Sequence, residues 1–319
     1  MTTPTTAPRV EVSGLTKRFG RVQAVNGLSF TAEPGRVTGF LGPNGSGKTT
    51  TLSMLLGLVR PDSGTATIGG RAYAALDRPA TVVGSLLSAD FHPGHTATAH
   101  LDIARRAIGV PQHRVAETLE MVGLRDAAHR KTGGFSLGMR QRLALAAALL
   151  PDPQVIVLDE PINGLDPEGI RWIRQLLRHL ASEGRTVMLS SHLLSEVQQT
   201  VDDVVIIRRG EVAYTGPLEG LQPSADDRVV LVSTPNNHRL ALAMEHAGLE
   251  VHGSRGDVMR VTGASPETVG NLAFDAGLPL SHLSTEEAGL EERFLALIGE
   301  GGAAAAAEPT STRTEEGSA

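Results

Sequence analysis

The sequence predicts an α/β protein with a largely parallel sheet, followed by a small α+β domain. Over about residues 9–222, short β-branched runs alternate with longer helical patterns, an order typical of strands joined by helical crossovers. The stretch of about 93–150 is almost wholly helical in character, so we interpret it as a helical subdomain inserted between two strands. The pattern changes after Gln222-Pro-Ser-Ala, and residues 226–298 form the second predicted domain.

The clearest strands of the first domain are short apolar runs: Val37–Leu41, Val155–Leu158, Thr186–Leu189 and Val204–Ile207. Such runs are typical of strands that are buried on both faces of a sheet. Between Pro167 and Glu183, apolar residues recur at helical spacing, at Ile170, Ile173, Leu177 and Leu180. This stripe predicts an amphipathic helix.

The second domain has a different order of elements. The predicted order is a strand, a helix, two strands, a helix and a strand, at Val229–Val232, Arg239–Ala247, Glu250–His252, Val258–Val261, Pro266–Ala276 and Pro279–Leu283. That order matches the split βαβ, ferredoxin-like unit. A final helix is expected over Gly289–Ile298. Residues 301–319 hold five consecutive alanines and then Pro, Thr, Ser and Glu, a composition that predicts a disordered tail.

The composition excludes several classes of function. There is no cysteine, which rules out disulfides, thiolate zinc sites and a cysteine nucleophile and fits a reducing cytosol. The longest apolar run, Leu143–Leu150, is far shorter than the roughly 20 residues that span a bilayer, and the N-terminus is no signal peptide. Residues 225–319 carry 6 Lys and Arg against 15 Asp and Glu, which argues against a nucleic-acid surface there. We therefore expect no direct membrane span and no nucleic-acid partner.

The strongest functional signal is a glycine-rich segment with a lysine, made of Gly42, Pro43, Asn44, Gly45, Ser46, Gly47, Lys48, Thr49 and Thr50. It fits the G-x-x-x-x-G-K-[ST] phosphate loop and lies between an apolar strand and the helical run Thr51–Leu56. Glycines let backbone N–H groups converge on a phosphate, and the helix N-terminus adds its positive end. Lys48 would neutralise the phosphate oxygens, and Thr49 would bind Mg²⁺. The alternative is a glycine-rich turn with a chance lysine.

Two adjacent carboxylates, Asp159 and Glu160, end another buried strand. Successive side chains of a strand point to opposite faces, so the two carboxylates can take different roles. One can hold a metal, directly or through water, while the other polarises an attacking water. A general base of this kind contributes about 10²–10⁴ in rate. The alternative is a carboxylate that caps the following helix.

Three further segments, together with these two, resemble the motifs of ABC transporter ATP-binding subunits. Phe135–Leu143 (FSLGMRQRL) resembles the ABC signature, Pro161–Asp166 (PINGLD) the D-loop, and Ser190–His192 (SSH) the switch-histidine segment. The resemblance covers about residues 10–222 and keeps the order of the family's motifs. It implies a P-loop NTPase with a RecA-like core and an ABC helical subdomain, which binds and hydrolyses ATP with Mg²⁺.

The resemblance also implies roles for single residues. It implies that Glu160 is the catalytic base and that Asp159 is a metal ligand together with Thr49. His192 could bond the γ-phosphate and sense whether it is present. Phe19 matches the aromatic residue that stacks on adenine in this family. A lone phenylalanine can equally belong to the core, so this role depends on its position in the motif order.

The signature and the D-loop imply a second nucleotide-binding subunit. Ser136 and the backbone N–H of Gly138 open a helix and so form a second anion site. In this family that site meets the nucleotide of the other subunit, and Asp166 of the D-loop is expected at a nucleotide as well. The partner would be an identical chain or a close paralogue. The signature departs from its commonest form at Leu137 and Met139, which we interpret as a subtype of the exporter branch.

A larger departure lies within the run Val82–Asp90. The family normally places there a glutamine that contacts Mg²⁺ and couples to the membrane subunit. Ser88 occupies roughly that place, with Asp90 close by, and either could act through water. The departure leaves open an alternative, a regulatory or non-transport ABC ATPase with slow or no hydrolysis.

The signature variant and the C-terminal run Gly289–Ile298 resemble drug, antibiotic and lantibiotic-immunity exporters. The resemblance implies an exporter of drug-, antibiotic- or peptide-like compounds, held at the cytoplasmic face of the membrane by a separate transmembrane permease. A soluble ABC ATPase acting on nucleic acid or the ribosome is the competing class, and a single cassette with an acidic appendage argues against it. His92, His95 and His100 lack an array of acidic partners, so we expect no metal there.

Overall fold

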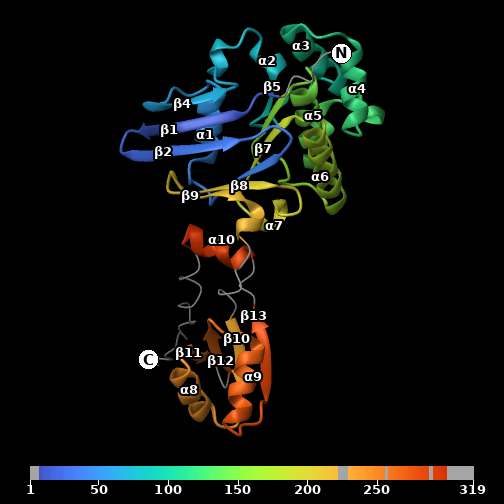
Figure 1. The fold of residues 1–319 in the computed structure, drawn as a ribbon. Helices are drawn as coiled ribbons and strands as arrows, with labels where there is room; N and C mark the ends of the chain where they lie inside the picture. The colour runs from blue at the N-terminus through green and yellow to red at the C-terminus, as the bar shows by residue number, and fades with distance from the viewer. Residues whose placement is uncertain (1–6, 222–228, 256–257, 287–289, 300–319) are drawn as a thin grey trace, which may run out of the picture. The chain divides into compact units, whose positions relative to one another are not determined.

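The structure is a computed structural model, and the residues that it describes are 7–221, 229–255, 258–286 and 290–299. The chain divides into two compact units, residues 1–220 and 221–319. The first contains the parallel sheet and the helical subdomain, and the second contains the small α+β domain (Figure 1). The predicted tail over 301–319 lies outside the described residues.

A six-stranded sheet forms the centre of the N-terminal unit. Its strands in spatial order are β5 (Val83–Leu86), β6 (Val155–Leu158), β7 (Thr186–Ser191), β3 (Val37–Leu41), β8 (Asp203–Arg208) and β9 (Glu211–Pro217). All neighbours are parallel except the β8–β9 pair, which confirms the largely parallel sheet. The register pairs Phe40 with Ser190 and Leu158 with Leu189, so β3, β6 and β7 end at one edge. Ligands of open parallel sheets bind at this carboxyl edge.

A three-stranded antiparallel sheet, which was not expected from the sequence, adds to the same core. Its order is β2 (Val22–Ala32), β1 (Val10–Phe19) and β4 (Ser63–Ile68). Register shifts interrupt the pairing of β1 with both neighbours. Such irregularities break the strict alternation of apolar and polar residues by which a half-buried strand is recognised. Leu15 and Leu28 of this sheet pack in one core with Phe40 of the central sheet.

The chain between β5 and β6 forms the helical subdomain. Its main helices are α3 (Ala97–Ile108), α4 (His113–Met121) and α5 (Leu137–Leu149). They share a core that includes Leu101, Leu119 and Leu143. The side chain of Thr96 caps the start of α3, and Gly109 ends this helix in the left-handed conformation.

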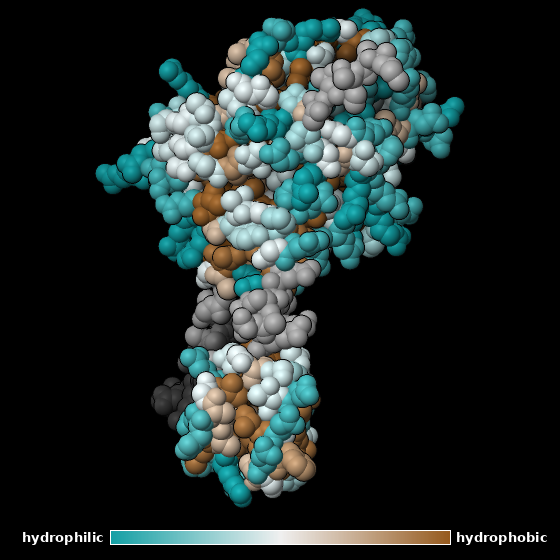
Figure 2. Space-filling model, viewed as in Figure 1, coloured by the Kyte–Doolittle hydropathy of each residue, from teal (hydrophilic) through white to brown (hydrophobic). Residues whose placement is uncertain are grey.

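Other helices flank the central sheet. The longer ones are α1 (Lys48–Leu55) and α6 (Pro167–Ser182). The short ones are α2 (Pro79–Val82), α7 (Leu194–Val197), η1 (Tyr73–Ala75) and η4 (Leu218–Leu221), while η2 (Arg125–Ala127) and η3 (Thr132–Gly134) belong to the helical subdomain. As the stripe predicts, α6 buries Ile173, Leu177 and Leu180, while hydrophilic residues dominate the visible side of the unit where it lies (Figure 2). None of the described helices has the length and apolar character that a membrane span requires.

The C-terminal unit has the predicted ferredoxin-like order. Its elements are β10 (Val229–Ser233), α8 (Asn237–His246), β11 (Glu250–Arg255), β12 (Val258–Thr262), α9 (Pro266–Asp275), β13 (His282–Glu286) and α10 (Leu290–Ile298). The sheet order is β11-β12-β10-β13 with antiparallel neighbours. Val230, Leu240 and Val261 belong to its separate core.

The last strand of this sheet is displaced from its predicted position. The sequence pattern suggested Pro279–Leu283, whereas β13 begins at His282, which pairs with Ser233. Proline lacks the N–H that a ladder needs, so Pro279 belongs to the preceding loop. The chain joins β10 only from Ser281, whose N–H donates to the carbonyl oxygen of Ser233 at 2.8 Å.

Candidate functional site

The phosphate-loop segment connects β3 to α1 at the carboxyl edge of the parallel sheet. Close packing requires glycine at two of its positions. A Cβ on Gly47, where φ is +106°, would lie 2.4 Å from the carbonyl oxygen of Ala24. A Cβ on Gly42 would lie 2.4 Å from the carbonyl oxygen of Ile207. The loop backbone is therefore held tightly against β2 and β8, and it leads into a helix N-terminus that can bind an anion.

Lys48 is the first residue of α1, and its side chain is only 7% exposed. Its ammonium donates to the carbonyl oxygens of Gly42, at 2.6 Å, and Pro43, at 3.4 Å. It also lies 3.6 Å from Oε1 of Glu160. The loop thus holds a cation at the edge of the sheet, with a carboxylate beside it.

Asp159 follows the last residue of β6 and connects three other elements. Its Oδ2 accepts a hydrogen bond from Thr49 Oγ1 of α1 at 2.7 Å, and its Oδ1 accepts one from the hydroxyl of Ser190 in β7. Its N–H donates to the carbonyl oxygen of Leu86 in β5 at 2.7 Å. Both carboxylate oxygens therefore have a partner, and these partners determine the orientation of the carboxylate.

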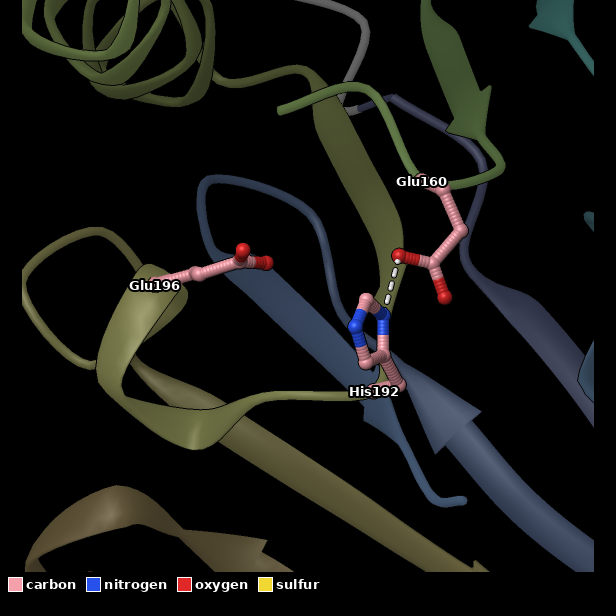
Figure 3. Close-up of side chains that lie close together, drawn as sticks. All are labelled: Glu160, His192 and Glu196. Atoms are coloured by element: carbon pink, nitrogen blue, oxygen red, sulfur yellow. Dashed lines mark hydrogen bonds and ion pairs between the residues drawn. The ribbon is translucent and has the colours of Figure 1, made fainter. Parts of the chain in front are cut away.

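Glu160 has a left-handed backbone, with φ at +47°, which is uncommon for a residue other than glycine. Its N–H donates to Ser190 Oγ at 2.9 Å, and its carbonyl oxygen accepts from Gln141 Nε2 at 3.3 Å. Its Oε2 lies 3.0 Å from Nδ1 of His192 (Figure 3). The backbone contacts hold the residue in this conformation, and its carboxylate reaches both Lys48 and His192.

The turn after β7 supports His192, which Figure 3 shows between Glu160 and Glu196. Ser191 Oγ donates to Glu196 Oε2 at 2.9 Å and accepts from the N–H of Leu193 at 3.1 Å. One possible ligand atom from each of the three drawn residues lies within 4.8 Å of the others. Hydrogen bonds already engage both carboxylates, so we interpret the cluster as the support of the histidine.

Three residues that were expected at a nucleotide lie at helix N-termini. The hydroxyl of Ser136 caps α5 by accepting from the N–H of Met139 at 3.3 Å, and Gly138 lies in the first turn. Asp166 caps α6 by accepting from the N–H of Gly169 at 2.8 Å. We call Lys48, Thr49, Asp159, Glu160 and His192 the phosphate-loop cluster. Within the described residues, no hydrogen bond or ion pair joins the side chains of Ser136 or Asp166 to this cluster.

Phe19, Ser88 and Asp90 also have no contact with the phosphate-loop cluster among the hydrogen bonds and ion pairs of the described residues. Phe19 ends β1 and is 50% exposed, with Lys17 Nζ 5.4 Å from the centroid of its ring. Half of the residue's surface is thus exposed, and the Lys17 ammonium lies over one face of the ring. Ser88 and Asp90 are both exposed. In the part of the chain that the structure describes, no hydrogen bond or ion pair connects either to Asp159.

Sequence reasoning missed two members of the network, Ser190 and Gln141. Ser190 is a fully buried hydroxyl that follows the apolar run Val187–Leu189 of β7, and this change from apolar to polar residues is the signal that could have identified it. Gln141 lies inside the signature segment, but its partner is a backbone carbonyl on another element. No sequence pattern identifies such a partner.

The loop, the carboxylates and the signature helix lie largely in a segment that matches a known family. Residues 25–163 match the family model described as ABC transporter. The bacitracin transport ATP-binding protein BcrA of Bacillus licheniformis is 36% identical over 301 residues, which are 92% of this chain and 98% of that protein. This chain belongs to the ABC transporter ATP-binding family. The BcrA protein of Enterococcus faecalis is 32% identical over 310 residues, with the same coverage of 92% and 98%.

Solved structures agree with this assignment. A structure described as the ATP binding subunit of an ABC transporter matches with a TM-score of 0.61 at 26% identity, covering 66% of this chain and 91% of its own. A second family model, described as a domain of unknown function, matches residues 228–291 in the C-terminal unit. Membership of the ABC family confirms the expected fold and the expected activity, the binding and hydrolysis of ATP.

Proposed function

We propose that this ABC ATPase powers the export of antibiotic- or peptide-like compounds through a separate transmembrane permease. Lys48 binds the phosphates of ATP, and Thr49 and Asp159 hold Mg²⁺. Glu160 is the general base, and His192 senses the γ-phosphate. The observation that supports these roles is one compact cluster, in which Lys48 and His192 contact the two oxygens of a single carboxylate beside the Thr49–Asp159 pair.

The donor set fits Mg²⁺. Thr49 and Asp159 offer a hydroxyl and a carboxylate, which are the hard oxygen donors that Mg²⁺ prefers, and the two oxygens lie 2.7 Å apart beside the phosphate loop. Magnesium, when bound, neutralises charge on the β- and γ-phosphates. Thr49 and Asp159 would hold it at the side of the loop where Lys48 begins the helix.

Glu160 has the surroundings that a base for water requires. Its side chain is 25% exposed, so water can reach the carboxylate. A phosphate in the loop would attract the Lys48 ammonium, which lies 3.6 Å from Oε1, and would free that oxygen to accept a proton. His192 would keep Oε2 oriented and could donate a hydrogen bond to the γ-phosphate.

A second nucleotide-binding subunit, either another copy of this chain or a close paralogue, would complete the site. Ser136 and Gly138 form the N-terminus of α5, and this anion site is not bonded to the chain's own phosphate-loop cluster in the described structure. The signature helix and the D-loop residue Asp166 would therefore face the nucleotide of the partner. Phe19 would stack on the adenine held by its own chain.

The relatives support the transport role. Two relatives that align along nearly the whole chain are ATP-binding proteins of bacitracin transport by name. Both alignments extend through most of the C-terminal unit as well as the ATPase unit. We therefore propose an antibiotic of this class as the exported cargo, and the cytoplasmic face of the membrane as the place of action.

The substitution Glu160→Gln tests the catalytic assignment, because it removes the base and keeps the size of the side chain. We expect kcat for ATP to fall by about 10²- to 10⁴-fold, the contribution typical of a general base, while nucleotide binding persists. Steady-state phosphate release and binding of a fluorescent ATP analogue measure the two effects. Glu168→Gln, at an exposed position of α6, is the matched control. Unchanged turnover in Glu160→Gln would contradict the role of this residue.

A further inference from the structure

A buried serine links the two carboxylate residues of the site. Ser190 lies near the end of β7 and is completely buried. Its hydroxyl donates to Oδ1 of Asp159, and its oxygen accepts from the N–H of Glu160 at 2.9 Å. A serine hydroxyl has one hydrogen to donate and lone pairs to accept with, so this side chain bonds both neighbours at once.

Strand pairing determines this contact. Strand β7 lies between β6 and β3, and Leu158 of β6 pairs with Leu189 of β7. Asp159 follows Leu158, and Ser190 follows Leu189. These two residues therefore lie side by side at the carboxyl edge of the sheet. The chain turns sharply after Asp159, because Glu160 has a left-handed backbone. The N–H of Glu160, at the start of this turn, donates to the same hydroxyl oxygen.

We propose that Ser190 is a positioning residue for ATP hydrolysis. It orients the carboxylate of Asp159 for the metal, and it holds the backbone of Glu160 in the conformation from which its carboxylate reaches the water. The inference depends on the roles proposed above for Asp159 and Glu160. Without the hydroxyl, Thr49 alone would orient the aspartate carboxylate, and the N–H of Glu160 would lose its partner.

Burial of a hydroxyl in this sheet does not by itself imply such a role. Thr38 of β3 is equally buried, and its hydroxyl has no hydrogen-bond partner in the described structure. Ser191, the residue after Ser190, is buried as well, but its hydroxyl bonds Glu196 and the turn that carries His192. Only Ser190, among these three, contacts the two residues assigned to the metal and the base.

The substitution Ser190→Ala tests the proposal. We expect kcat for ATP to fall about 10- to 100-fold, because small displacements of catalytic groups have effects of this size. KM for ATP should change by less than about threefold, since the phosphate loop is untouched. The Mg²⁺ concentration for half-maximal rate should rise. Binding of a fluorescent ATP analogue should stay unchanged without Mg²⁺ and should lose part of the affinity gained with Mg²⁺.

Thr38→Val is the matched control, because it removes a buried hydroxyl of the same sheet that bonds neither carboxylate. It should retain wild-type kcat and the wild-type Mg²⁺ requirement. Ser190→Cys keeps the size of serine with a weaker donor, so it should show a smaller defect of the same kind. It replaces Ser190→Ala in the comparison if the alanine variant does not give a wild-type melting temperature.

Two results would overturn the proposal. One is an unchanged kcat and Mg²⁺ requirement in the Ser190 variants. The other is a loss of activity in Thr38→Val equal to that in Ser190→Ala, which would show a general effect of sheet packing. Full turnover in Glu160→Gln would instead refute the base assignment on which the proposal depends. Turnover that is lost in Glu160→Gln but intact in Ser190→Ala refutes the role of the serine alone.

Discussion

At the scale of single residues, the unusual signature changes the surroundings of the D-loop. Leu137 stands where glycine is commonest in the family, and its side chain is 58% exposed. It lies over Gly164, where a Cβ would be only 2.2 Å from Leu137 Cδ2 and where φ is +76°. A side chain at position 164 would therefore have to displace the Leu137 side chain and adopt a left-handed backbone.

A double-mutant cycle tests this dependence. Gly164→Ala should lower the free energy of unfolding by more than the ~1–2 kcal/mol that a left-handed conformation costs a non-glycine residue, because the new methyl group also meets Leu137. In the Leu137→Gly background, only the conformational strain should remain. Urea unfolding of the four proteins gives the coupling energy. Equal losses in both backgrounds would show that the two residues act independently.

At the scale of elements, helix α3 carries a partly buried histidine. The ring of His100 meets Phe91 edge-on, with centroids 4.7 Å apart. Burial lowers the pKa of His100, and the nearby His95 lowers it further. His92 and His95 stack on each other with centroids 4.5 Å apart. These histidines contribute to packing in the helical subdomain.

The lowered pKa of His100 predicts a loss of stability in acid. The unfolded chain has the ordinary histidine pKa of about 6.5 and binds the proton first as the pH falls. The stability contributed by neutral His100 is therefore present above this pH and is lost below it. A hydrogen bond from Arg105 lowers the pKa of Asp102 on the same helix, so that carboxylate titrates below this window.

The measurement is the free energy of unfolding between about pH 7 and pH 5. His100→Phe, which keeps an aromatic ring against Phe91, should reduce the decrease in stability over this range. His113→Gln, at an exposed position on α4, is the control for removal of a histidine. The same pH dependence in wild type and His100→Phe would contradict the assignment.

At the scale of the whole molecule, two units with separate cores form the chain. The core of the parallel sheet and that of the helical subdomain lie within residues 1–220, and a third core lies in the C-terminal unit. The bacitracin-transport relatives align along 92% of the chain, so the ATPase and most of the ferredoxin-like unit are matched together. We therefore expect the export function to belong to the full chain with its permease.

Drug susceptibility tests the proposed cargo. Co-expression of this chain with its transmembrane partner in a sensitive bacterium should raise the inhibitory concentration of bacitracin. Lys48→Ala should abolish the increase, because the phosphate loop loses the cation that we propose binds the phosphates of ATP. An immunoblot should show equal amounts of the wild-type chain and the Lys48→Ala variant. An inhibitory concentration that is the same for wild type and Lys48→Ala would exclude bacitracin as the cargo.

Much of the fold was predictable because apolar periodicity reports burial directly. The runs of β3, β6, β7 and β8 and the stripe of α6 are examples, since each is buried along its length or along one side. The antiparallel sheet was not predicted, because register shifts break the alternation of apolar and polar residues along its strands. The strand β13 was misplaced by a few residues, because local propensity does not include the pairing with β10 that begins at Ser233 and His282.

The sequence by itself determined the chemistry of this protein. Lys48, Thr49, Asp159, Glu160 and His192 lie in short motifs, and the resemblance of these motifs to the ABC family was enough to predict their roles. Only the tertiary structure decided how these groups are held. Ser190 bonds Asp159 across 31 residues of sequence and Gln141 bonds Glu160 across 19, and both contacts depend on how strands and helices pack. Such contacts leave no periodic or local pattern, because they form between elements that meet only when the chain folds.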